Sequence, residues 1–160
     1  MDPKTKQKAL RLLTNGIYIM TSRHGDQFGA ATVTWVSQAS FKPPLIMAAL
    51  RKDGNVFESL EQSRTAALHI LDKNQANIAQ AFFSSAKESG GKLNGEPYSQ
   101  GKRSSAPVLD FAHAYLECEL REIMKTQGDH AVVLLEVVNA HIRKDVAPLT
   151  VSDSPWEYGG

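Results

Sequence analysis

The segment from Ala114 to Arg121 constrains the fold more than any other part of this sequence. Its small and apolar residues alternate one by one with polar or aromatic residues. This period of two is the spacing of a half-buried antiparallel strand, in which successive side chains point to opposite faces of a sheet. The alternation loses its phase at Ile123, which predicts a β-bulge near Glu122. We therefore expect a chain built mainly from antiparallel strands.

Other strand-like segments agree with this expectation. Runs of β-branched and apolar residues predict strands at 17–22, 28–40, 45–50, 65–71 and 130–141. Short helices are predicted at 4–14, 55–63 and 74–83. Because the strands follow one another without a regular helical crossover, their order favours an antiparallel barrel over a parallel sheet.

Length and composition indicate one globular unit. The 160 residues fit a single domain covering 1–160, since domains most often contain about 100–150 residues. The hydrophobic fraction of 42% and the charged fraction of 22% are those of an ordinary globular protein. The segment 84–105 is different, because it is rich in Ser, Gly and Lys and exceeds an ordinary connection. We expect it to be a mobile, lid-like loop.

Charge and composition exclude several classes of function. The net charge is +1 and the basic residues are scattered among acidic ones, so no nucleic-acid partner is expected. The single cysteine, Cys118, cannot form an intramolecular disulfide, and a reducing, cytoplasmic localisation is the expectation. No run approaches the ~20 apolar residues of a membrane helix, so no membrane partner is expected. The histidines show no metal-ligand spacing, and no metal site is predicted.

The segment 29–50 is the first candidate binding region. It combines small residues with hydroxyl side chains and one large ring, and it turns at Pro43-Pro44, where the prolines cannot donate hydrogen bonds to a sheet. Its alanines leave room for a flat molecule to approach the backbone. The hydroxyls and the ring belong to Thr32, Thr34, Ser37, Ser40 and Trp35. We interpret the segment as a pair of strands that holds a planar ligand.

Residues 51–55 form a second candidate, placed where a predicted strand ends and a helix begins. Free amides at a helix N-terminus, together with the charge of Arg51 or Lys52, suit an anion such as a phosphate. A solvated turn with Asn55 as an ordinary N-cap accounts for the same residues. The local sequence leaves both interpretations open.

His130 is a third candidate, because it follows a turn at Gly128-Asp129 and leads into an apolar strand. From that position its imidazole could project into a site, although an isolated histidine is more often structural. The common nucleotide motifs do not apply. Gly90-Gly91-Lys92 lacks the remaining residues of a P-loop, and no Gly-x-Gly-x-x-Gly follows a strand.

Taken together, these segments resemble the flavin reductase-like family of FMN-binding split barrels. The resemblance covers nearly the whole chain, through residues 15–21, 29–50, 51–55 and 128–130. The C-terminal residues 156–160 also resemble the flavin reductase-type domain fused to flavodiiron proteins in photosynthetic microbes. The family implies a mainly β fold, an antiparallel, Greek-key-like split β-barrel with a few short helices, and a homodimer.

The same resemblance implies an oxidoreductase that transfers a hydride from NADH or NADPH to bound FMN. The flavin ring would lie against Thr32, Val33, Thr34, Trp35, Val36, Ser37 and Ser40. The FMN phosphate would be held by Arg51, Lys52, Asp53, Gly54 and Asn55. His130 would be the catalytic position on the nicotinamide side, and 84–105 would be the lid.

Two other functions fit the same residues. The chain could be an electron carrier whose FMN is reduced by a protein partner, or a module that binds flavin without turnover. As recipients of the electrons, the resemblance suggests a redox protein or a flavin-dependent monooxygenase.

Overall fold

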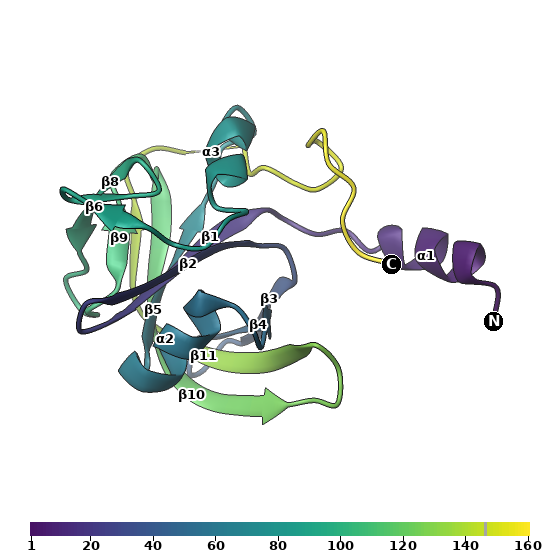
Figure 1. The fold of residues 1–160 in the computed structure, drawn as a ribbon, viewed down its shortest axis with the longest axis horizontal. Helices are drawn as coiled ribbons and strands as arrows, with labels where there is room; N and C mark the ends of the chain where they lie inside the picture. The colour runs from purple at the N-terminus through teal and green to yellow at the C-terminus, as the bar shows by residue number, and fades with distance from the viewer. Residues whose placement is uncertain (146) are drawn as a thin grey trace.

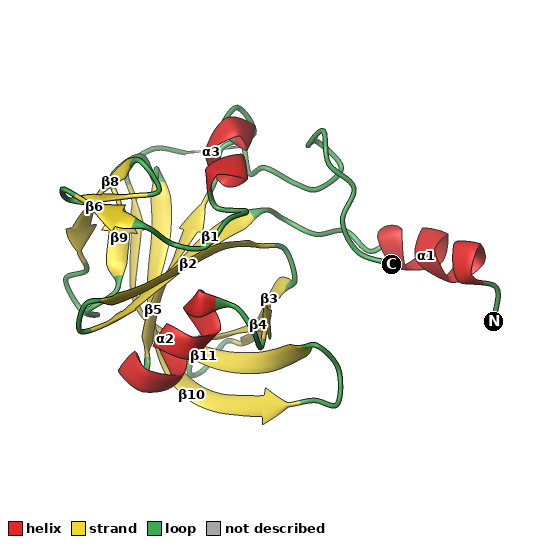
Figure 2. Cartoon of the chain, viewed as in Figure 1, coloured by secondary structure: helices red, strands yellow, loops and turns green. Residues whose placement is uncertain are grey.

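The computed structural model describes residues 1–145 and 147–160. Its main body is a seven-stranded sheet, and Figures 1 and 2 show its arrangement. The strands are β1 (Tyr18–His24), β2 (Gln27–Val33), β3 (Val36–Ser40), β4 (Leu45–Arg51), β5 (Thr65–Ile70), β10 (Ala114–Lys125) and β11 (His130–Ile142). Every pairing in this sheet is antiparallel. The prediction of a mainly β, antiparallel fold with a few short helices is confirmed.

The order of the strands makes the sheet curl. It runs β2-β1-β5-β10-β11-β4-β3, so β2 and β3 are its two edges. Only Thr34 and Trp35 separate these edge strands in the chain. The sheet must therefore bend until its edges approach each other at this point (Figure 1).

The prediction of one strand over 28–40 is wrong, because the chain turns at Thr34-Trp35. The Val36 N–H donates to the Thr34 carbonyl at 3.1 Å, a three-residue turn that breaks the strand. The residues here have high β propensity and carry no local turn signal. The turn follows from the need to reach the opposite edge of the sheet, which a local pattern does not contain.

Helix α2 (Asn55–Ser63) fills the opening of the curled sheet. It packs against β1, β2 and β4, and its residues Val56, Phe57 and Leu60 are buried. They join a core that includes Leu120 and Cys118 of β10. Burial raises the pKa of Cys118 to about 12, so this thiol is an apolar core group. The predicted bulge is confirmed by a register shift between Leu120 and Glu122.

The segment 84–105 contains regular structure, so its interpretation as a loop is wrong in this respect. It forms β6 (Glu88–Ser89), β7 (Lys92–Leu93) and β8 (Glu96–Gln100), which make a second sheet with β9 (Pro107–Leu109) in the order β6-β7-β8-β9. Gly90, Gly91 and Gly95 adopt positive φ angles in its tight turns. Leu93 is fully buried and anchors the sheet. Whether the segment moves as a lid stays a prediction.

A buried carboxylate attaches the next loop to the main sheet. Glu117 of β10 is fully buried and accepts hydrogen bonds at 2.8 Å from the backbone N–H groups of Arg103 and Ser104. Asn139 of β11 donates to it at 2.7 Å. Burial would raise the pKa of Glu117, but these hydrogen bonds outweigh burial and lower it. The polar face of the alternating strand is thus covered here rather than solvated.

The two remaining helices lie at the periphery. Helix α3 (Ala76–Ala81) packs near β2, whereas α1 (Pro3–Arg11) projects from the body and lies beside the C-terminus (Figure 1). All residues of α1 are exposed. Arg11 holds the C-terminal segment by an ion pair with Glu157 and a 3.0 Å hydrogen bond to the Gly159 carbonyl. Among the described residues, none of the helices is both long and apolar enough to cross a membrane.

His69 links the two sheets through both ring nitrogens. It is fully buried on β5, its Nδ1–H donates to the Ile19 carbonyl at 2.9 Å, and its Nε2 accepts from the Leu109 N–H at 3.0 Å. This arrangement uses the neutral ring, because a protonated Nε2 could not accept. Burial accordingly lowers the pKa of His69 to about 4.

We predict that this histidine makes stability depend on pH. Its folded-state pKa lies below the ordinary 6.5, so its contribution is present above pH 6.5 and is lost as the pH falls toward 4. Urea denaturation of the native protein at pH 7 and pH 4.5 should differ by about 2 kcal/mol from this group. His69→Gln should be less stable at pH 7 and should lack that part of the slope. An unchanged slope in the variant would contradict the assignment.

Candidate functional site

A cavity of about 260 Å³ lies where the end of β2, the start of α2 and the C-terminal segment meet. This volume is slightly below the about 300–1,000 Å³ of typical ligand pockets. A neighbouring cavity of about 410 Å³ shares Thr34, Arg51 and Phe83 with it. Because they share lining residues, the two cavities are adjoining parts of one candidate site.

The structure brings most of the predicted site residues together. Those that line the cavity are Thr32, Val33, Thr34, Trp35, Arg51, Asp53, Gly54, Asn55 and His130. Val36 and Ser37 line another cavity of about 650 Å³, while Ser40 and Lys52 line neither. The division follows from the turn at Thr34-Trp35, since residues beyond it belong to the opposite edge of the sheet.

Thr34 carries the most informative polar group of the cavity. The residue is 9% exposed, and its Oγ1 is buried without a hydrogen-bond partner among the described residues. Leaving such a group unpaired costs about 1–3 kcal/mol. A buried, unpaired hydroxyl in the wall of a cavity is the arrangement expected of a group that pairs with a ligand.

Thr32, which the sequence pattern does not distinguish from Thr34, has a structural task. Its Oγ1 donates to the Ala79 carbonyl at 2.6 Å, and its N–H donates to the Phe82 carbonyl at 3.1 Å. Both bonds attach α3 and the residue that follows it to the outer edge of β2. The hydroxyl of Thr32 is therefore already engaged, and that of Thr34 is available.

The start of α2 forms the second polar wall. Gly54 is the N-cap of this helix and Asn55 its first residue, so the interpretation of Asn55 as an N-cap is wrong. The Asn55 Oδ1 instead accepts from the Ala30 N–H of β2 at 3.4 Å. A Cβ at Gly29 would lie 2.6 Å from backbone atoms of Asn55 and Val56, so only glycine allows this approach. Gly54, Asn55 and Val56 at the start of α2 line the cavity, and a helix N-terminus with free amides favours an anion.

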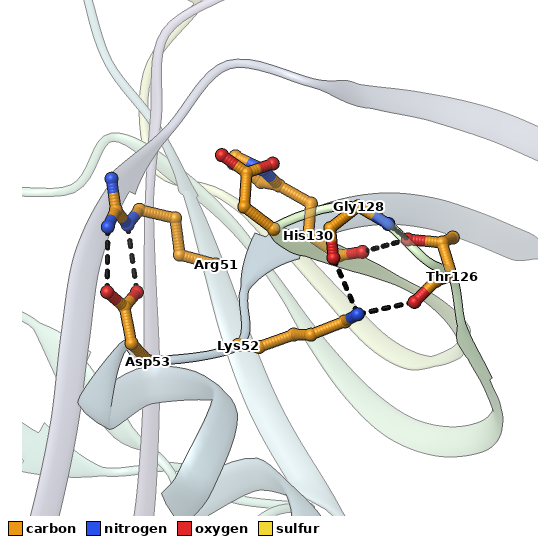
Figure 3. Close-up of polar contacts among 7 residues, drawn as sticks. Arg51, Lys52, Asp53, Thr126, Gly128 and His130 are labelled. Carbon is orange, nitrogen blue, oxygen red and sulfur yellow. Dashed lines mark hydrogen bonds and ion pairs between the residues drawn. The ribbon is translucent and has the colours of Figure 1, made fainter.

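Arg51 and Lys52, adjacent in sequence, point to different partners (Figure 3). Arg51 binds Asp53 through two nitrogens, at 2.9 and 2.7 Å. This contact raises the pKa of Arg51 and lowers that of Asp53. Lys52 donates to the carbonyls of Thr126 and, at 2.6 Å, of Gly128. It braces the β10–β11 turn, so Arg51 alone of the two brings its charge to the cavity.

His130 is oriented by its neighbour and packs against a ring. Its Nδ1 lies 2.7 Å from Asp129 Oδ1, which lowers the pKa of Asp129. Because a carboxylate only accepts, Nδ1 carries the proton and Nε2 remains for another partner. The ring centroid of Trp35 lies 4.7 Å from that of His130 and 5.6 Å from that of Tyr158. These three rings form one aromatic side of the cavity.

Several lining residues are absent from the sequence-based set: Ala30, Ala31, Ala49, Leu50, Val56, Phe82, Phe83, Ser84, Ser85 and Tyr158. For Phe82 and Phe83 the sequence does offer a signal, because two adjacent aromatic residues at the end of a predicted helix either fill the core or cover a ligand. Phe82 is core, whereas Phe83 is 56% exposed and contacts Trp156 with ring centroids 4.9 Å apart. Within the described ranges, groups of three or more His, Cys, Asp or Glu arranged to hold a metal are absent.

Comparison with known proteins identifies the class to which this fold and cavity belong. Residues 10–156 match the family described as "Flavin reductase like domain". The chain therefore belongs to the flavin reductase-like family, as the sequence resemblance predicts.

Individual relatives refine this picture. Diflavin flavoprotein A 1 of Synechocystis is 32% identical over 86% of this chain and 24% of its own length. An NADH-dependent FAD reductase of Streptomyces globisporus is 26% identical over 88% of this chain and 78% of its own length. The solved NADH:FAD oxidoreductase of S. globisporus C-1027, in complex with NAD and FAD fragments, aligns with a TM-score of 0.78 at 25% identity, covering 94% and 90% of the two chains. This chain spans about a quarter of the diflavin relatives it matches.

We predict that Thr34→Val stabilises the ligand-free protein by about 1 kcal/mol, since it removes a buried hydroxyl that has no partner. Urea denaturation of the flavin-free protein measures this change. Thr32→Val is the matched control and should destabilise by about 1 kcal/mol, because it removes the donor to the Ala79 carbonyl. Equal losses of stability in both variants would show that Thr34 has a partner.

Proposed function

We propose that this chain is a flavin reductase domain that binds FMN in the cavity and accepts a hydride from NADH or NADPH. The observation that carries the proposal is the buried, unpaired Thr34 hydroxyl in a cavity with an aromatic side and an anion-favouring end. Membership of the flavin reductase-like family supports the same assignment.

The residues of the cavity fit a flavin mononucleotide. Ala30, Ala31 and Ala49 keep one wall low enough for a flat ring to reach the backbone. Trp35 and Tyr158 offer aromatic surface to the same ring. The start of α2 and the guanidinium of Arg51 suit a phosphate. The cavity thus offers the two kinds of contact that FMN needs, a surface for the ring and groups for the phosphate.

A bound flavin supplies a hydride acceptor that no protein side chain provides. The chain's own residues would position and shield the reactants. Thr34 would pair its hydroxyl with a polar atom of the ring. Asp129 fixes the imidazole of His130 so that Nε2 is directed to a partner, which we assign to the nicotinamide side. Phe83, at the rim, would limit the entry of water.

We propose further that the chain forms a homodimer of split barrels. The curled sheet, whose edges approach at Thr34-Trp35, supports the split-barrel form. The fully exposed helix α1 supports the dimer, since a nine-residue helix is marginal in water without packing. Leu10 of this helix and Leu13, which follows its end, line the cavity of about 650 Å³ together with Trp35 and Met47, and a second copy would cover that apolar surface. We place the dimer in the cytoplasm.

Absorbance spectroscopy tests the proposed activity. The purified protein with added FMN should show a protein-bound flavin spectrum, and NADH or NADPH should bleach it under anaerobic conditions. Thr34→Val should bind FMN more weakly, by about 1 kcal/mol, because the ring loses a hydrogen bond. A spectrum that neither nicotinamide bleaches would contradict the reductase.

Neighbouring substitutions test the phosphate end. Arg51→Ala should weaken FMN by about tenfold and riboflavin hardly at all, because only FMN carries a phosphate. Lys52→Ala removes the same charge from the next residue and should have a much smaller effect, since this amine is bound to the carbonyls of Thr126 and Gly128. Fluorescence titration gives all four affinities. Equal losses from both variants would contradict the assignment of Arg51.

One observation favours a second candidate, an FMN electron carrier reduced by a protein partner. The diflavin relatives are about four times as long as the part that this chain matches. These relatives are named diflavin flavoproteins, so a domain like this one could exchange electrons with a second flavin or with another protein. Bound flavin that is bleached by a reduced redox protein, but by neither nicotinamide, would select this function.

A further inference from the structure

The cation of the candidate phosphate site is already engaged within the protein. Two guanidinium nitrogens of Arg51 donate to the two carboxylate oxygens of Asp53, at 2.9 and 2.7 Å (Figure 3). Both side chains line the cavity. This two-bond geometry is the one that an arginine uses to bind a phosphate. Asp53 therefore occupies the face of Arg51 that a phosphate would take.

A second carboxylate adds negative charge near Arg51. Asp129, at the β10–β11 turn, acts on Arg51 by its charge as well. Asp53 itself lines the cavity, whereas Asp129 is bound to the cavity residue His130. Lys52 keeps its charge, but its amine is held at the β10–β11 turn by the carbonyls of Thr126 and Gly128, and it does not line the cavity. A phosphate can therefore use the guanidinium of Arg51 only by displacing Asp53.

We infer that Asp53 competes with the phosphate of a bound flavin for the guanidinium of Arg51, and thereby limits how much the phosphate adds to the affinity. The inference rests on the proposed function, because it concerns the phosphate end of the same site. The unpaired Thr34 hydroxyl lies in the same cavity and is an independent sign that a ligand belongs there. The consequence is a flavin held mainly by its ring, which exchanges with solution more readily than one held at both ends.

The size of the effect of Asp53 on flavin affinity should depend on the charge of the flavin. A phosphate monoester such as that of FMN carries about two negative charges at neutral pH. Each phosphate of the FAD diphosphate carries one, and riboflavin carries none. Competition with a carboxylate therefore penalises FMN most, FAD less and riboflavin not at all. Asp53 would be a specificity-determining residue that shifts the preference of the site away from FMN.

Asp53→Asn tests the inference, because it removes the charge and keeps the shape. At low ionic strength it should tighten FMN by about five- to tenfold, FAD by less, and leave riboflavin unchanged. The gain should shrink at high salt, which screens exposed charges. Asp26→Asn is the matched control, since Asp26 is an exposed partner of Arg23 at the β1–β2 turn and does not line the cavity. It should leave all three affinities unchanged.

A double-mutant cycle shows whether the effect acts through Arg51. In an Arg51→Ala background, Asp53→Asn should lose most of its gain for FMN. A gain of the same size with and without Arg51 would overturn competition for the guanidinium. If Asp53→Asn changes the affinities for all three flavins equally, or changes none of them, the inference is overturned and the proposed function still stands. If neither the native protein nor Asp53→Asn binds any of the three flavins, the proposed function and this inference are both overturned.

Discussion

The connection of the two sheet edges by Thr34 and Trp35 is the constraint on which the rest of the structure depends. Strands that are neighbours in the chain but lie at opposite edges of a seven-stranded sheet require the sheet to curl until these edges approach each other. The curled sheet leaves an opening that α2 fills, and it brings the helix start against β2. Gly29 permits that contact, since a Cβ there would meet the backbone of α2. The cavity lies where these three features meet.

Two features of the cavity make the protein less stable than apolar, fully packed residues would at the same positions. The Thr34 hydroxyl is buried without a partner among the described residues, and valine would have nearly the same shape. The rings of Trp35 and Tyr158 stay partly accessible, at 37% and 46%, beside a cavity. Folding alone favours neither arrangement. Their coincidence in one place is what makes a ligand site a better explanation than an irregularity of packing.

The sequence predicts what short-range patterns determine. The alternation along 114–121 yields β10 with its bulge, and the apolar runs yield β1, β4, β5 and β11 at nearly their observed positions. The turn at Thr34-Trp35 escapes prediction because its cause is the position of β3 at the far edge. The strands of 84–105 escape because glycine turns and one buried residue, Leu93, define them without any periodicity. The burial of Glu117 likewise depends on a loop distant in sequence.

The roles of the polar residues in the site are harder to predict from the sequence than the position of the site, because those roles depend on where each side chain points. Arg51 is the last residue of β4, and Lys52 is the first residue of the turn that leads to α2, so their side chains leave the backbone in different directions. One therefore reaches the cavity and the other the β10–β11 turn, although a sequence shows only two adjacent cations. The remaining cation is then paired with Asp53, two residues further on. A segment with two positive charges thus supplies little net positive charge to the cavity, and recognition of a ligand there depends more on hydroxyl, ring and backbone groups than on charge.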